Sequence, residues 1–298
     1  MTATIPAASV RRGSNEVPRQ GRSRWRARVN TASFHTAAIV LSCVWFFPIA
    51  LVLITSFRTN SDVLRNGVTA WPETWTLEPY ARAWFNADMA QAMVNSLIIT
   101  VPTVLLTLLL SSFAAFALSR YRIPFRRTLL IVMLAGNLLP AQLMLIPWLK
   151  ISEGAGLYDT LLVVILFQTA SGLGFYTFVM YGFMRAIPIE LQDAAAIDGA
   201  GVLRTYWQII MPLTRPALAA LGALAFTWVF NDLLLAITLL RTSTQFPITA
   251  AVLSLLGEYN AEWNVIGAAT VIAAIPCVIV FLVFQKQFVG GLSLGAVK

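Results

Sequence analysis

The sequence predicts an all-α, polytopic membrane protein with six transmembrane helices. The 298-residue chain is 58% hydrophobic and 11% charged, with a mean hydropathy of +0.75, whereas soluble domains carry about 25% charged residues. Six apolar stretches each reach the roughly 20 residues that a helix needs to cross a ~30 Å hydrocarbon core. None of them alternates apolar and polar residues as the strands of a membrane barrel do. The chain is therefore predicted to fold in lipid as a helical bundle.

The predicted spans cover roughly residues 34–57, 90–118, 128–149, 160–184, 216–240 and 264–285. Residues 1–33 form a basic N-terminal tail, predicted to be disordered, and residues 34–298 form one transmembrane domain. Within the spans, Pro140, Pro147, Gly172 and Gly174 are expected to allow bends that open a cavity.

Basic residues predict the orientation of the spans, because Lys and Arg collect in cytoplasmic loops. With six spans, both termini lie on one side. That side receives Arg11, Arg12, Arg19, Arg22, Arg24, Arg26, Arg28, Arg120, Arg122, Arg126, Arg127, Arg185, Arg204, Arg215, Lys286 and Lys298. The opposite side receives only Arg58, Arg65, Arg82, Lys150 and Arg241. Both termini are predicted to be cytoplasmic. The formal charge of +8 reflects this topology rather than nucleic-acid binding, although the tail could also contact anionic lipid heads.

Catalytic and metal-binding motifs are missing from the sequence. Cys43 and Cys277 lie in apolar runs without CxxC spacing, and the single histidine, His35, has no partner motif. No GxxxxGK[ST], HExxH or GxSxG occurs. We therefore predict no catalytic, cofactor-binding or metal-binding residue, and no enzymatic activity in this chain.

The segment between the fourth and fifth spans, residues 185–215, is unusually polar for this chain. It contains LQDAAAIDGAGVLRTYWQIIMP, residues 191–212. Two short helices are predicted, with Gly199 in a left-handed conformation at the end of the first and Asp198 capping the second. Pro212 and Pro216 are expected to end the second helix before the fifth span. The alanine- and glycine-rich bend permits close approach by another surface; the alternative is a capped helical hairpin that only links two spans.

This segment resembles the cytoplasmic loop of permease subunits of bacterial ABC importers. That family has Glu-Ala-Ala, three residues, Gly, and about nine residues later an apolar residue followed by Pro. Ala194 and Ala195 match the alanines, Asp198-Gly199-Ala200 match the usual Asp-Gly-Ala, and Met211-Pro212 match the ending. The family's glutamate is Asp193 here, which keeps the charge but shortens its reach.

The resemblance extends to ALSRYRIPFRRTLL (117–130), LIPWLKISEGAGLYDTLLVVIL (145–166), FMRAIPIELQDAAAIDGA (183–200), FNDLLLAITLL (230–240) and FQKQFVGGLSLGAVK (284–298). These segments look like the carbohydrate and glycerol-phosphate importer group, which is maltose-permease-like. Phe230 stands where Trp is common in that group. The resemblance implies the type I ABC importer permease fold.

The resemblance also implies function and partners. The chain would be the transmembrane subunit that moves an oligosaccharide, monosaccharide or glycerol phosphate into the cytoplasm across the cell (inner or plasma) membrane. Two partner ATPase subunits would bind and hydrolyse ATP, and this chain would hold no cofactor. A second, homologous permease and an extracellular or periplasmic solute-binding protein would complete the assembly. The implied ATPase-coupling residues are Asp193, Ala194, Ala195, Asp198, Gly199 and Ala200.

Polar residues in the spans are candidates for the solute path: Asn137, Gln142, Gln168, Asn231 and Asp232. Amides in membrane helices also serve as helix–helix contacts, so both interpretations stay open for Asn137, Gln142 and Gln168. Asp232, the only acid inside a predicted span, either lines the external mouth or makes a structural interhelix hydrogen bond.

The external loop from Arg58 to Asp88 carries Trp71, Trp75 and Trp84. It is predicted either to anchor at the membrane interface or to dock the solute-binding protein. A secondary transporter or channel for a small polar solute is the alternative function. Such a protein is expected to carry more intramembrane ionisable groups within an internal repeat.

Overall fold

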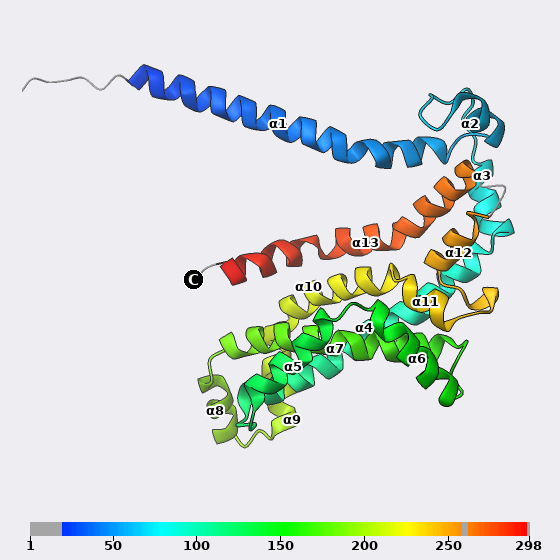
Figure 1. Cartoon of the computed structure of the whole chain (residues 1–298). Coiled ribbons are helices and arrows are strands. Elements are labelled where there is room, and N and C mark those ends of the chain that lie inside the picture. The colour runs from blue at the N-terminus through cyan, green and yellow to red at the C-terminus, as the bar shows by residue number, and fades with distance from the viewer. Residues whose placement is uncertain (1–19, 258–261, 297–298) are drawn as a thin grey trace, which may run out of the picture. The chain divides into compact units, whose positions relative to one another are not determined.

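The computed structural model describes residues 20–257 and 262–296, with side chains for residues 33–257 and 262–287. Every regular element in these ranges is a helix (Figure 1), which confirms the predicted all-α class. The chain divides into two compact units, Met1–Ala50 and Leu51–Lys298. The first contains most of α1 (Gln20–Thr55). Because α1 begins at Gln20, the end of the predicted 1–33 tail is helical, while residues 1–19 lie outside the described residues.

Five helices of the described chain are long and apolar enough to cross a membrane, and a bent pair makes up to six. The candidate spans are Ser33–Thr55 of α1, α4 (Met89–Arg120), α7 (Leu161–Ala186), Val202–Phe230 and the first part of α13 (Trp263–Ala296), with α5 (Arg126–Leu138) and α6 (Gln142–Gly154) as the bent pair. The chain is therefore a multi-pass helical membrane protein.

Shorter elements connect the spans. Before α4 lie α2 (Asn60–Asn66), α3 (Glu78–Ala81) and η1 (Arg82–Asn86). Between α7 and α10 (Met211–Phe230) lie α8 (Glu190–Ile197), α9 (Val202–Thr205) and η2 (Tyr206–Ile210). After α10 follow α11 (Leu234–Leu239), η3 (Ser243–Gln245) and α12 (Ile248–Ser254). Within the second unit, α8 and α9 lie at one end of the bundle, whereas α2, α3, α11 and α12 lie at the other (Figure 1).

The centre of the bundle is the contact between α4 and α7. The face of α4 that is buried carries small polar residues at helical spacing: Ser96, Thr100, Thr103, Thr107 and Ser111. Gly172 of α7 lies against this face, because a Cβ there would stand 3.0 Å from Thr107 Cγ2. Small residues let membrane helices approach closely where lipid offers no hydrophobic driving force. This interface therefore fixes α7 against α4.

The glycines of α7 permit packing rather than bending, contrary to the expectation from the sequence. The helix continues without a break from Leu161 to Ala186. A Cβ on Gly174 would lie 2.2 Å from the Met133 carbonyl oxygen and 2.4 Å from Asn137 Nδ2. The missing side chain admits the backbone of α5, so α5 packs directly on α7.

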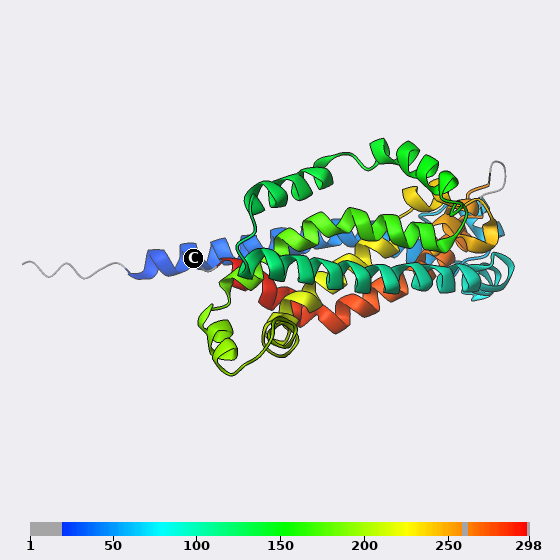
Figure 2. The same ribbon diagram turned by 90° about the horizontal axis from the view of Figure 1, so that it is seen from below.

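The third predicted span, 128–149, is broken. α5 ends at Leu138, α6 starts at Gln142, and their axes meet at 97°. Pro140 lies in the break, as expected for a residue that lacks a backbone N–H, whereas Pro147 lies inside α6 without ending it. Figure 2 shows the two helices arching beside α7.

The fifth predicted span, 216–240, is shifted toward the N-terminus. One helical run extends from Val202 to Phe230, so Pro212 and Pro216 do not end the second loop helix. The π-helical turn η2 precedes these prolines, with the Met211 N–H donating to the Tyr206 carbonyl. The run stops at Phe230, and α11 begins separately at Leu234.

The external loop contains a buried ion pair. Arg58 is fully buried, and its Nε and Nη2 donate to the two carboxylate oxygens of Asp62 at 2.8 Å each. Arg58 Nη1 donates to the Gly67 carbonyl (2.8 Å), and Asn264 Nδ2 donates to the Arg58 carbonyl (3.0 Å). This cluster, called here the external clasp (Arg58, Asp62, Gly67 and Asn264), joins the end of α1 to the start of α13.

Candidate functional site: the polar loop and the cavity at Asp232

The bend between α8 and α9 is a Schellman motif. Gly199 has φ +77°, the left-handed conformation predicted for it. The Ala200 N–H donates to the Ala195 carbonyl (2.9 Å) and the Gly199 N–H to the Ala196 carbonyl (3.1 Å). These bonds satisfy carbonyls that a helix end would otherwise leave unpaired, so the bend has one defined conformation.

Asp198 does not cap the second helix as predicted. It occupies the C-cap position of α8, and the N-cap of α9 is Gly201, without a side-chain hydrogen bond. The left-handed turn at Gly199 places three residues, Gly199 to Gly201, between Asp198 and the start of α9 at Val202. Asp198 is exposed. Its carboxylate makes no hydrogen bond or ion pair among the contacts of the described residues.

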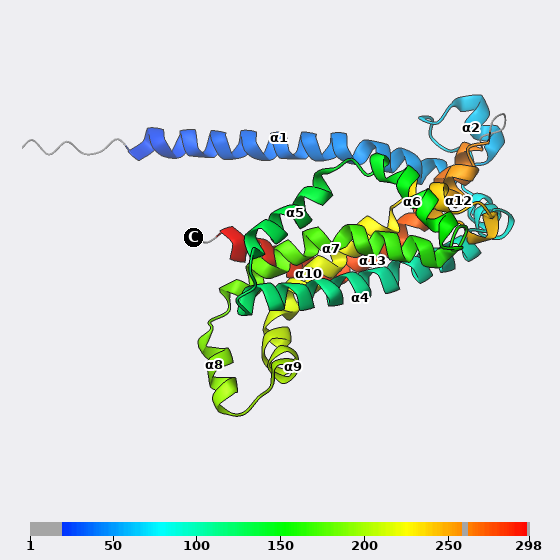
Figure 3. The same cartoon turned by 60° about the horizontal axis from the view of Figure 1, so that its bottom comes forward.

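The first arm of the loop is open to solvent. Of the six predicted coupling residues, Asp193, Ala194, Asp198 and Gly199 are exposed, Ala200 is half-buried and only Ala195 is buried. Ile197, beside them, is 87% exposed. A Cβ added at Gly199 would have no atom within 4 Å. The structure thus brings all six residues onto one projecting element, α8 and its bend (Figure 3).

The second arm is anchored. Tyr206 is fully buried, stacks on Phe113 of α4 with ring centroids 4.5 Å apart, and lies 2.6 Å from Ser112 through its hydroxyl. Ile210, one helical turn later, is also fully buried. Trp207 is half-exposed against the edge of Phe113.

The start of the loop is also held. Arg120, at the end of α4, donates from Nη2 to the Met184 carbonyl near the end of α7 (2.7 Å). The open bend therefore projects between two fixed attachments, one at α7 and one at η2.

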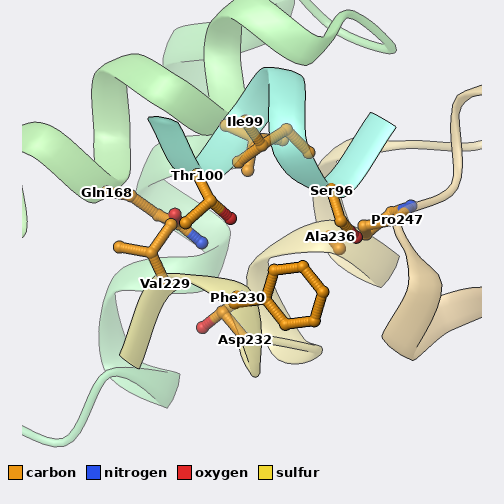
Figure 4. A pocket seen from close by; sticks show the side chains of 10 residues that line it. Ser96, Ile99, Thr100, Gln168, Val229, Phe230, Asp232, Ala236 and Pro247 are labelled. Carbon is orange, nitrogen blue, oxygen red and sulfur yellow. The ribbon is translucent and has the colours of Figure 1, made fainter. Parts of the chain in front are cut away.

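A small cavity lies near the external end of the bundle. Its lining includes Ser96 and Thr100 of α4, Gln168 of α7, and Phe230 and Asp232 at the α10–α11 break (Figure 4). The open volume is about 10 Å³, room for about one water molecule. Among the described residues, Thr100 Oγ1 and Gln168 Oε1 are buried without a hydrogen-bond partner. Unpaired buried acceptors of this kind are sites where water or a hydroxyl can bind.

Asp232 makes structural contacts at this cavity. Its Oδ1 accepts from the Leu235 N–H at 3.0 Å, which caps the first turn of α11, and its carbonyl accepts from Thr249 Oγ1 at 2.9 Å. Gln168 lines the same cavity as Asp232 (Figure 4). Of the five predicted path residues, the structure therefore brings together Gln168 and Asp232.

The other three predicted path residues lie elsewhere and are exposed. Asn137 donates to the Met133 carbonyl (3.1 Å) and Asn231 to the Thr227 carbonyl (2.8 Å), each one turn back on its own helix. Gln142 starts α6. Sequence reasoning missed Ser96 and Thr100; the recurrence of Ser and Thr every three or four residues along α4 is the pattern that indicates them.

The family described as "Binding-protein-dependent transport system inner membrane component" matches residues 87–293. Two relatives are the diacetylchitobiose uptake system permease protein NgcG of Streptomyces coelicolor, 31% identical over 89% of this chain and 88% of the relative, and the melibiose/raffinose/stachyose import permease protein MelC of Bacillus subtilis, 30% identical over 88% and 94%. A third, the osmoprotective compounds uptake permease protein GgtD of a Synechocystis species, is 33% identical over 89% and 91%.

A solved bacterial ABC transporter that imports the acidic polysaccharide alginate contains a chain with the same fold. Its TM-score is 0.79 at 23% identity, over 91% of this chain and all of the other. The sequence match, the relatives and the fold agree. The chain belongs to the family of binding-protein-dependent transport system inner membrane components, as a permease of the carbohydrate ABC importer type.

Proposed function

We propose that this chain is the transmembrane subunit through which an ATP-driven importer moves a sugar or sugar-like solute into the cytoplasm. It would sit in the inner or plasma membrane with both termini in the cytoplasm. Two ATPase subunits, a second and homologous permease and an extracellular solute-binding protein would be its partners, and ATP would bind to the ATPase chains alone. The relatives carry names of sugar uptake systems, which supports this class of solute.

The proposal rests on the solvent-exposed bend at Gly199, whose flanking segments are held by the contacts of Arg120 and Tyr206. Exposed apolar side chains on a small element indicate a protein contact, and Ile197, Val202 and Leu203 are all exposed there. The anchored second arm, held by Tyr206, would pass displacement of the bend to the spans. On this basis the coupling contact comprises Asp193, Ala194, Ala195, Asp198, Gly199 and Ala200.

The orientation of the loop follows from charge. Arg120, Arg122, Arg126, Arg127, Arg185 and Arg204 lie at the end of the bundle that carries α8 and α9. An excess of basic residues marks the cytoplasmic side, which is where ATP is available. The bend is thus accessible to a cytoplasmic ATPase.

The test replaces Gly199 in the full transporter, co-expressed with its ATPase, second permease and binding protein. Gly199→Val strains a left-handed backbone, at a cost of about 1–2 kcal/mol, and also adds bulk. Gly199→Asn adds bulk but tolerates the left-handed conformation. Because about 1.4 kcal/mol is a tenfold change, we expect Gly199→Val to lower ATPase co-purification and ATP-driven uptake about tenfold. Gly199→Asn should lower both as well, through its bulk at the contact.

Gly156 supplies the matched control. It has φ +68° and open space around its Cβ position, but it lies between α6 and α7 at the opposite end of the bundle. Gly156→Asn should leave ATPase binding unchanged. If Gly199→Asn transports normally while Gly199→Val does not, the bend needs only its conformation and the close contact is refuted. Uptake by the purified chain without any ATPase would favour a secondary transporter instead.

A further inference from the structure

The break in the third span lies deep within the span. α5 and α6 have 13 residues each, about 20 Å of helix at 1.5 Å per residue. The break at residues 139–141 therefore lies about 20 Å of helix away from either end of the pair. If the bent pair forms one span, with Arg127 and Lys150 at opposite faces of a ~30 Å hydrocarbon core, this position falls inside the membrane.

Backbone carbonyls are unpaired at this break. Pro140 has no N–H for the Gly136 carbonyl, and α5 ends before residues 141 and 142 could serve Asn137 and Leu138. Leu139 has an extended backbone, with ψ 134°. On the α6 side, the Leu143 and Met144 N–H groups bond to the Pro140 and Ala141 carbonyls at 3.0 Å each. The break therefore presents a run of acceptor oxygens, from residue 136 to residue 139.

The described chain leaves this segment open, apart from the contact of Asn137 with Gly174 of α7. Every residue from 135 to 143 is exposed. Lipid cannot cover it either, because an unpaired carbonyl in hydrocarbon costs several kcal/mol and lipid-exposed irregular backbone does not occur within the membrane core. Broken helices at membrane depth are tolerated where they are buried in protein or line a water-filled cavity. A helix of a partner chain has its own backbone N–H groups paired within the helix, so it offers few donors to a row of open carbonyls, whereas water donates to all of them. These carbonyls therefore favour a water-filled cavity in the assembled transporter.

Two amide side chains border the open carbonyls. Asn137 uses its Nδ2 on the Met133 carbonyl, which leaves its Oδ1 available. Gln142 makes no side-chain hydrogen bond among the contacts of the described residues, and it is exposed. The sequence from residue 128 to residue 149 contains no charged residue. The segment offers neutral acceptors and amides, with no cation to hold a phosphate or carboxylate.

We propose that residues 136–142, the open bend of the third span, line the aqueous path and bind the hydroxyl groups of a neutral, polyhydroxylated solute. Hydroxyl donors satisfy the free carbonyls, and the Gln142 amide both donates and accepts. An anionic sugar would meet a row of carbonyl dipoles with their negative ends toward it. The inference rests on the proposed import function and narrows its solute class to neutral sugars.

Cysteine accessibility tests the path. The assembled transporter in proteoliposomes carries Cys43→Ala and Cys277→Ala, and then Leu139→Cys or Gln142→Cys singly. The control is Leu105→Cys, on the unbroken helix α4, where the side chain is apolar and 63% exposed. A charged methanethiosulfonate reagent should modify the two bend positions at least about tenfold faster than position 105, because only water carries the reagent. Equal rates at all three positions would overturn the inference.

Solute protection tests the chemistry. The probe is whichever of raffinose, melibiose and diacetylchitobiose supports the fastest uptake, compared with glycerol 3-phosphate. The neutral sugar should slow modification of Gln142→Cys, and Gln142→Leu should raise the KM for its uptake at unchanged ATPase assembly. Protection by glycerol 3-phosphate alone, or none by a transported sugar, would refute the solute contact. If the bend positions stay unmodified in a transporter that still imports sugar, this inference is refuted but the proposed import function stands. If they are modified but no solute is taken up, the proposed import function is refuted.

Discussion

The Tyr206 hydroxyl lies 2.6 Å from the Ser112 hydroxyl, and this contact joins the second arm of the loop to α4 across 94 residues of sequence. The Tyr206 ring also stacks on Phe113. Tyr206 therefore attaches the second arm of the loop to α4 by a hydrogen bond together with ring packing.

Tyr206→Ala should uncouple ATP hydrolysis from transport. Removal of a fully buried aromatic ring costs about 3–5 kcal/mol, so η2 would separate from α4 while the exposed bend stays intact. Tyr206→Phe loses only the hydroxyl contact, about 1 kcal/mol. The number of solute molecules imported per ATP should fall strongly for the first variant and little for the second. Equal stoichiometry in both would show that this anchor does not transmit movement.

Gly174→Ala should displace α5. The new Cβ would meet the Met133 carbonyl at 2.2 Å, and backbone cannot yield as a flexible side chain can. Overpacking of this kind costs about 1–3 kcal/mol, so the thermal unfolding temperature of the purified complex should fall. Gly182→Ala is the control on the same helix, because its Cβ would meet nothing within 4 Å. A normal unfolding temperature for Gly174→Ala would mean that α5 packs differently.

Asp232 can be tested for its two roles separately. Asp232→Asn keeps an oxygen for the Leu235 N–H but removes the charge, whereas Asp232→Ala removes the cap, which costs about 0.5–2 kcal/mol. If Asp232 serves only as a cap, uptake kinetics should be normal for the Asn variant and stability should fall only for the Ala variant. A changed KM for Asp232→Asn would place its charge on the solute path.

The external clasp should be stable over the physiological pH range. Hydrogen bonds from the Arg58 guanidinium hold the pKa of the Asp62 carboxyl well below its ordinary value, with support from Asn66. A carboxyl with a lowered folded-state pKa stabilises the fold above its unfolded value, about 3.9, and loses this contribution as the pH falls through its folded-state pKa. The unfolding temperature of wild type should thus exceed that of Asp62→Asn by a constant margin from pH 5 to pH 8. That margin should narrow only below about pH 4. A margin that narrows between pH 5 and pH 7 would contradict this assignment.

The helical class and the location of the first, second, fourth and sixth spans followed from apolar length, because only helices of that length satisfy their backbone in lipid. The Gly199 turn was also predictable, since a glycine after an alanine-rich helix is the usual C-terminal signal. The Asp198 cap was wrong because the same turn had to complete its Schellman bonds before a new helix could start. The glycine signal at the end of the first loop helix was reliable, whereas the start of the second depended on the turn between them.

Packing between distant helices was not predictable from one sequence. Gly172 and Gly174 suggest flexibility when α7 is considered alone, and their role in close approach depends on Thr107 and Met133 of two other helices. In the same way, Gln168 and Asp232 meet only because α7 packs beside the α10–α11 break. Pro212 and Pro216 misled because the first stands in the opening turn of α10 and the second inside it, and the helix continues through both.

α10 (Met211–Phe230) is a straight helix that meets the second arm of the loop at an angle, as α9 turns away from its line in Figure 3. Its 20 residues measure about 30 Å at 1.5 Å per residue. By simple geometry, a tilt of about 5° at one end moves the other by about 3 Å, comparable to the length of a hydrogen bond. If an ATPase displaces the bend as proposed, α10 would carry that small rotation from the loop to its far end, which stops next to Asp232.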